Sequence, residues 1–208
     1  MKNSFLCLVG LATMACASSN PAPQAEPSRP APSPALLVTT LAGQRIPVLP
    51  LTFLVAEAPA DEFLPPDRVA RLVWADSLIG AMMEEHGPEV DWVLPPELRR
   101  IAARAPNMVT DPDRMGQAVM RSPNLEIVPD PLRSYLRALS AMSDARLVLI
   151  PAALRFKPDS GGIRAELVMV IADTRNGRVI WRSHPSVVGD TPTAALRATI
   201  AHILPDLD

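Results

Sequence analysis

The period of the hydrophobic pattern changes along the chain, and each change predicts an element. Between residues 68 and 86 apolar positions recur every three to four residues, which predicts an amphipathic helix. Pro65-Pro66-Asp67 precedes this helix and Gly87-Pro88 follows it, as expected for a helix start and stop. Similar proline-plus-acid starts predict helices over 98–105, 115–120 and 132–142, and threonines 191 and 193 cap a last helix over 194–204.

Runs of apolar and β-branched residues predict the strands. Residues 36–41 and 46–55 are two such runs, and Pro47 and Pro50 place the second at strand ends or a sheet edge. A short strand is expected at 90–94. In the last third, strands are expected at 146–150, running on toward Phe156, then at 163–172 and at 178–183. A turn at 159–162 and Asn176-Gly177 connect these last three strands as hairpins.

The predicted order of elements is β–α–β–α–α–α–β–β–β–α. It indicates a single α/β (α+β) domain over 36–208, in which helices pack on a mixed sheet that ends in a three-stranded antiparallel meander. On the 163–172 strand, alternation places Arg164 and Glu166 on one face and the apolar side chains on the other.

The first 35 residues have a different character. Lys2 and a ten-residue apolar run are typical of an export signal over 1–17, and the run is too short to cross a bilayer. Two processing sites remain open: cleavage before Cys16, which would then carry a lipid, or cleavage after Ala17. Residues 18–35 hold six prolines among small polar residues, which predicts an extended, disordered linker.

Composition narrows the class of function. The chain is 48% hydrophobic and 20% charged with a net charge of −2, so neither a disordered chain nor a nucleic-acid partner is indicated. Both cysteines, Cys7 and Cys16, lie in the signal region, so the domain is expected to hold no disulfide. We therefore expect a bacterial envelope protein, anchored to the membrane by a lipid on Cys16 and facing the periplasm. A soluble periplasmic or secreted form is the alternative.

The chain carries no strong signature of catalysis. It lacks the common phosphate-loop, dinucleotide, nucleophile-elbow and zinc motifs, so no cofactor and no metal site are predicted. Its acidic residues fall where they cap helices or turns, and no pair is placed for acid–base work. The basic residues are 18 arginines and two lysines. Arg99, Arg100 and Arg104 fall on one short helix and, with Trp92, form the candidate surface for a partner or ligand; a solvated helix face is the plainer interpretation.

Three segments resemble a group of exported bacterial adaptor domains. The segment 143–150 resembles their step from a helix through Ala-Asp into an apolar strand, and 171–181 resembles their strand–turn–strand hairpin ending in Trp181. Residues 46–53 are similar to their opening strand. The group includes the curli-secretion lipoprotein CsgG, the penicillin-binding-protein activator LpoB and the amino-terminal domain of TolB. The resemblance implies a periplasmic, partner-binding or scaffolding domain. Ile150-Pro151 departs from the group pattern, which commonly has a glycine there, and the pore-forming hairpins of the group have no counterpart.

These observations lead to one main hypothesis and two alternatives. The main one is a non-enzymatic, lipid-anchored adaptor that binds an envelope protein, with its contact surface within 98–121. The first alternative is an envelope protein that binds a small ligand or glycan in a cleft lined by Trp92, Arg99 and Arg100; a well-formed pocket with converging polar groups would favour it. A hydrolase is the second alternative, and the absence of a nucleophile–base or metal signature weighs against it.

Overall fold

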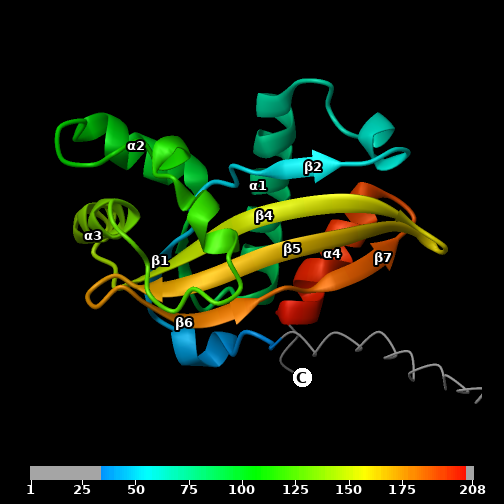
Figure 1. Ribbon diagram of the computed structural model, residues 1–208. Coiled ribbons are helices and arrows are strands. Elements are labelled where there is room, and N and C mark those ends of the chain that lie inside the picture. The colour runs from blue at the N-terminus through cyan, green and yellow to red at the C-terminus, as the bar shows by residue number, and fades with distance from the viewer. Residues whose placement is uncertain (1–33, 205–208) are drawn as a thin grey trace, which may run out of the picture. The chain divides into compact units, whose positions relative to one another are not determined.

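A five-stranded mixed sheet is the centre of the computed structural model, which describes residues 34–204. The predicted signal peptide and all but the last two residues of the predicted linker 18–35 lie outside the described residues. The strands are, in spatial order, β2 (Leu54–Ala56), β4 (Leu147–Asp159), β5 (Gly162–Asp173) and β6 (Arg178–Ser183), with β7 (Ser186–Gly189) also paired to β5. β4, β5 and β6 are antiparallel, which confirms the late meander (Figure 1).

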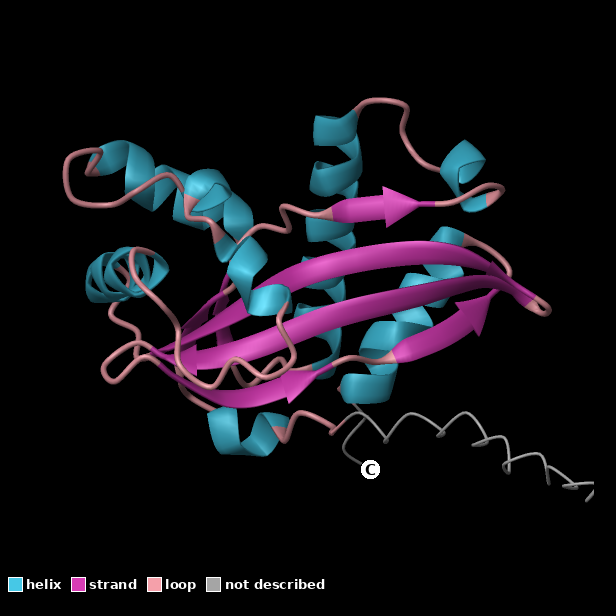
Figure 2. Ribbon diagram, viewed as in Figure 1, coloured by secondary structure: helices cyan, strands magenta, loops and turns pink. Residues whose placement is uncertain are grey.

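Helices cover both faces of this sheet, as Figures 1 and 2 show. Helices α1 (Arg68–His86) and α4 (Pro192–Ile203) pack on one face, and α2 (Pro95–Arg104) and α3 (Leu132–Met142) lie on the other. Each face has its own apolar core: the first core includes Ile79, Met83, Leu196 and Phe156, and the second includes Leu98, Leu136 and Ile150. The single α/β domain that the sequence predicts is confirmed.

The predicted strand 46–55 is split into two short strands. β1 (Arg45–Pro47) pairs in parallel with β3 (Asp91–Val93) through the α1 crossover, and β2 pairs in parallel with β4. The split follows from backbone chemistry, because Pro47 and Pro50 have no N–H to donate. The next N–H, of Leu51, donates to the buried Asp76 carboxylate on α1 (2.7 Å) rather than to a strand. β2 lies at the edge of the sheet, as the prolines indicate.

Two other segments have a different type of secondary structure from the one predicted. The expected strand 36–41 is instead a 3₁₀ helix at Val38–Leu41. The expected helix 115–120 is two 3₁₀ turns, at Pro112–Arg114 and Gln117–Arg121. Gly116 between them has a φ of 79°, a left-handed conformation that ends a right-handed helix. Strand β7 was not predicted from the sequence at all.

A β-bulge in β4 changes which residues face which core. Pro151 pairs with Met169 and Ala153 pairs with Val168, so Ala152 is an extra residue without a partner on β5. Before the bulge, the even-numbered Val148 and Ile150 face the second core; after it, the even-numbered Leu154 and Phe156 face the first core. The odd-numbered Ala153 and Arg155 therefore point to the side of α2 and α3.

The close packing of α4 on β7 gives the first testable prediction. A Cβ added to Gly189 would lie 2.5 Å from the backbone nitrogen of Ala195, at the start of α4. Because backbone cannot move aside cheaply, we expect Gly189→Ala to lower the free energy of unfolding by about 2 to 3 kcal/mol. Gly161→Ala is the matched control, since its Cβ would only touch Val188 at 3.7 Å. Urea denaturation of the two variants measures the difference, and equal stabilities would contradict this packing.

Candidate functional site

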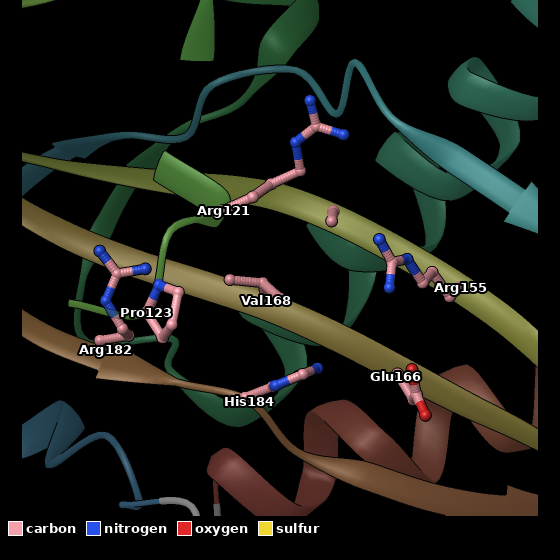
Figure 3. A pocket seen from close by; sticks show the side chains of 8 residues that line it. Arg121, Pro123, Arg155, Glu166, Val168, Arg182 and His184 are labelled. Carbon is pink, nitrogen blue, oxygen red and sulfur yellow. The ribbon is translucent and has the colours of Figure 1, made fainter. Parts of the chain in front are cut away.

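A concave site lies on the sheet face against which α2 and α3 pack, in a part of that face that neither helix covers. It is a pocket of about 180 Å³ over β4, β5 and β6, shown in Figure 3. We call it the basic pocket, and its lining residues are Arg121, Pro123, Ala153, Arg155, Glu166, Val168, Arg182 and His184. Its floor is apolar, because the paired residues Ala153 and Val168 occupy the middle of the two central strands.

One buried and one half-buried polar side chain fix the wall of the pocket, which is formed by residues 117–125. Gln117 is fully buried and donates from Nε2 to the carbonyl oxygens of Pro50 (3.1 Å) and Pro112 (3.2 Å). Arg182 on β6 donates to the carbonyl oxygens of Met120 (2.6 Å) and Leu125 (3.2 Å). The wall is therefore held in place before any ligand arrives, which lowers the entropic cost of binding.

The electrostatics of the basic pocket are one-sided. In the described part of the chain, no carboxylate forms an ion pair with Arg121, Arg155 or Arg182. Glu166 is the one acidic residue of the lining, and Lys157 binds both of its oxygens at 3.0 and 2.9 Å. Burial lowers the pKa of the Arg182 guanidinium below its usual value, as expected for a desolvated cation without a counter-charge.

Stacking on Phe53 orients two of the arginines. The guanidinium carbon of Arg121 lies 4.3 Å from the centre of the Phe53 ring, and that of Arg155 lies 5.6 Å from it. Such cation–π contacts hold a guanidinium without consuming its N–H groups. The Arg155 side chain has no hydrogen bond to a described residue, so its five N–H donors are available to a ligand.

A second polar cluster ties α1 to α2. Arg99 donates to both oxygens of Asp113 (2.8 Å each) and to Oδ2 of Asp76 (3.2 Å). Burial raises the pKa of Asp76 to about 6, although the Leu51 N–H and the Arg99 guanidinium favour its charged form. Arg99 in turn holds the pKa of Asp113 below its ordinary value. Since each acceptor in this cluster is matched by a donor of the fold, its arrangement is that of a structural bracket.

The residues that the sequence singled out are not brought together as one surface. Trp92 is buried, and its Nε1 donates to the carbonyl of Gly87 (2.8 Å), so its side chain belongs to the core rather than to an exposed contact surface. Arg99 is engaged in the bracket, and Arg100 pairs with Glu97 (2.6 Å) on the same helix. Arg104 is exposed near the end of α2. Trp92 lines a depression beside Pro88, whereas Arg99 lines two others, between α1 and α2 and beside Val109.

The sequence did contain a signal for part of the basic pocket. The two-residue turn at 160–161 places Asp159 opposite Gly162, and counting back from it places Arg155 opposite Glu166. Arg121, Arg182 and His184 carried no such signal, since they come from separate elements that only the tertiary fold brings together.

The described residues also set limits on other kinds of site. Within 34–204, no group of three or more histidine, cysteine or acidic side chains is placed to hold a metal ion. In the same range, none of the helices has both the length and the apolar character needed to span a bilayer.

No protein-family model matches the chain, and no curated protein matches it. Solved structures resemble it in fold. The C-terminal domain of LpoB from Salmonella enterica is 14% identical, with a TM-score of 0.44 over 74% of this chain and 93% of that one. The PelC dodecamer from Paraburkholderia phytofirmans is 15% identical, with a TM-score of 0.42 over 86% and 96%.

Lipoprotein GNA1162 from Neisseria meningitidis is 14% identical, with a TM-score of 0.37 over 70% of this chain and 80% of that one. LpoB thus appears both among these structures and in the group that the sequence resembles. At such identities the likeness concerns the fold alone, and membership of a sequence family is not shown.

Proposed function

We propose that this protein is a lipid-anchored adaptor of the bacterial cell envelope, which acts by binding an acidic partner protein in the basic pocket and not by catalysis. The anchor rests on the sequence, in which Cys16 ends an export signal and a proline-rich linker follows. The observation that carries the binding role is that Arg121, Arg155 and Arg182 line one pocket without a carboxylate partner among the described residues.

Charge favours this surface over the helix that the sequence singled out. On α2, Glu97 already pairs with Arg100, and Asp76 and Asp113 pair with Arg99, which leaves Arg104 as the one candidate arginine of this helix without a carboxylate partner among the described residues. In the basic pocket the guanidinium groups are oriented by Phe53 and by backbone carbonyls, and their charge is not neutralised. Charge-assisted hydrogen bonds from arginine to carboxylate are among the stronger polar contacts that a partner can add.

Photo-crosslinking in cells tests this proposal. A crosslinking amino acid at Asn124, an exposed residue beside the pocket, is expected to capture a discrete partner, and the same amino acid at Ala103 on α2 is not. Arg155→Glu should abolish the capture at Asn124, because it places a carboxylate where the partner's carboxylate binds. Arg104→Glu is the matched control, since it makes the same change on the other surface.

The outcomes separate the two surfaces. Capture at Asn124 that depends on Arg155 supports the proposal. Capture only at Ala103, lost in Arg104→Glu, would show that the partner binds α2 instead. Palmitate labelling that is unchanged in Cys16→Ser would contradict the lipid anchor without affecting the pocket.

A small anionic ligand is the second candidate occupant. The apolar floor of Ala153 and Val168, lined by several arginines, resembles the pocket expected of the small-ligand alternative, although it lies at a different place from the cleft the sequence predicted. In that case low-molecular-mass anions should raise the melting temperature of the protein, and Arg155→Glu should remove the effect.

A further inference from the structure

The cationic groups of the basic pocket are spread along the sheet and do not meet at one point. Arg155 on β4 pairs with Glu166 of β5, and Arg182 on β6 pairs with Val170 of β5. Four residues of β5 separate these two positions, a distance of about 13 Å at the usual rise of a strand. Figure 3 shows Arg182 and Arg155 at opposite ends of the pocket with Val168 between them.

Along the pocket, a cationic group is followed by the apolar floor and then by a second cationic group. The apolar floor is Val168 with its pairing partner Ala153. A ligand that contacts all three parts needs two anionic groups as far apart as the two arginines, with an apolar group between them. An extended peptide has this geometry built in, because side chains at positions i, i+2 and i+4 point to one face and span about 13 Å.

We propose that the partner's recognition element is an extended segment with acidic side chains four residues apart and an apolar side chain midway between them. This inference rests on the proposed function and specifies the partner's chemistry. One acidic side chain would bind Arg155 and the other Arg182, while the apolar side chain covers Val168. Single small anions fit less well, since each could engage only one end of the pocket.

Glu166 does not block the Arg155 end of the pocket. It stands beside Arg155 in the register, and Figure 3 shows it pointing away from the middle of the pocket. Lys157 binds its carboxylate, so Glu166 does not compete for Arg155. A segment that runs from Arg155 over Val168 to Arg182 leads away from this carboxylate, which would repel an acidic side chain.

Fluorescence anisotropy with the purified full-length protein and labelled nine-residue peptides tests the spacing. The probe carries glutamates at its third and seventh positions, valine at its fifth, and serine and threonine elsewhere. The control peptide has the same composition but places its glutamates side by side. We expect the spaced peptide to bind at least about tenfold more tightly, because only it reaches both arginines.

Variants of the protein test whether Arg155 and Arg182 each bind one glutamate of the peptide. Arg155→Gln should weaken binding of the spaced peptide about tenfold, and this arginine makes no hydrogen bond on which folding depends. Arg182→Lys keeps the charge, but the carbonyls of Met120 and Leu125 would take most of the three N–H donors of the lysine and leave few for a carboxylate, so it should weaken binding to a similar extent. Arg104→Gln, outside the pocket, should leave the affinity within about twofold. Circular dichroism checks that each variant is folded.

The remaining outcomes distinguish this inference from the proposed function. If both peptides bind with equal affinity and Arg155→Gln weakens both, the proposed spacing of the acidic side chains is wrong. The proposal of an acidic partner protein would still be supported. Binding of inorganic phosphate or of vesicles containing phosphatidylglycerol in preference to either peptide would overturn the spacing and replace the protein partner. No binding of any anion, together with no capture at Asn124, would overturn both.

Discussion

Exchange of two neighbouring side chains of β4, in the double variant Arg155→Phe/Phe156→Arg, is expected to prevent the domain from folding. After the bulge at Ala152, Arg155 faces the pocket and Phe156 the first core. Successive side chains of a strand point to opposite faces, so the exchange puts each side chain on the face that the other occupied. Phe156→Arg would place a guanidinium in an apolar core without a counter-charge, and Arg155→Phe would expose an aromatic ring on the pocket face.

The size of this effect follows from the burial of the exchanged side chains. Phe156 is fully buried, and moving its side chain into water costs roughly 2 kcal/mol. Burial of an unpaired guanidinium adds several kcal/mol. The total is comparable to the whole stability of a domain, which is about 5 to 15 kcal/mol.

The measurement is the presence of a cooperative urea transition in the soluble protein. Arg155→Phe alone is the matched control and should cost no more than about 1 kcal/mol, because Arg155 is exposed. A double variant that unfolds at the same urea concentration as the wild type would show that Phe156 does not face the first core.

The second large expected effect is a fall in stability of about 3 kcal/mol as the pH rises from 4 to 7. Burial raises the pKa of Asp76 from 3.8 to about 6 in the folded chain. Between these values the folded chain binds a proton that the unfolded chain has released, so acid favours folding in this window. Above pH 6 the carboxylate is charged in both states, and the full cost of burying its charge is present.

Other acidic groups make the protein less stable as the pH falls, but they do so at a lower pH than Asp76. The pKa of Asp113 is lowered chiefly by its hydrogen bond to Arg99, so its contribution to stability is lost only as the pH falls below about 4. The bonds that Asp173 accepts from Arg146 and the turn amides outweigh its burial and lower its pKa, so it follows the same rule. Urea denaturation between pH 4.5 and 7 therefore isolates Asp76.

Asp76→Asn identifies the group responsible. The amide oxygen can still accept from the Leu51 N–H, but the side chain no longer titrates, so the fall in stability across this window should disappear. Asp91→Asn is the control, because Asp91 is exposed and pairs with Arg45 at the surface at 3.5 Å. Identical pH profiles for the wild type and Asp76→Asn would exclude Asp76 as the source.

The elements that the sequence predicted well are those with a local chemical signal. Asp67 accepts from the Ala70 N–H at the start of α1, and Thr191 accepts from the Ala194 N–H at the start of α4. Asp173 accepts from the Arg175 N–H in the hairpin between β5 and β6. Each signal acts within a few residues, so it can be read without knowledge of the tertiary fold.

The failures involve residues whose role depends on distant parts of the chain. The run 46–55 is apolar enough for a strand, but its course is set by Asp76, more than twenty residues later. Trp92 was a candidate contact, yet Gly87 provides a buried carbonyl for its indole N–H. The bulge at Ala152 is invisible in an unbroken apolar run, so the sequence could not show that β4 changes which residues face each core.

A backbone hydrogen bond connects the two ends of the described part of the chain. The N–H of Leu36, where the predicted linker ends, donates to the carbonyl of Ile203 at the end of α4 (2.7 Å). A fluorescent protein fused after α4 would thus lie beside the segment that leads to the proposed anchor at Cys16. The turn at Ser160 and Gly161, exposed at the far tip of the β4–β5 hairpin in Figure 1, is the better position for a reporter or a surface attachment.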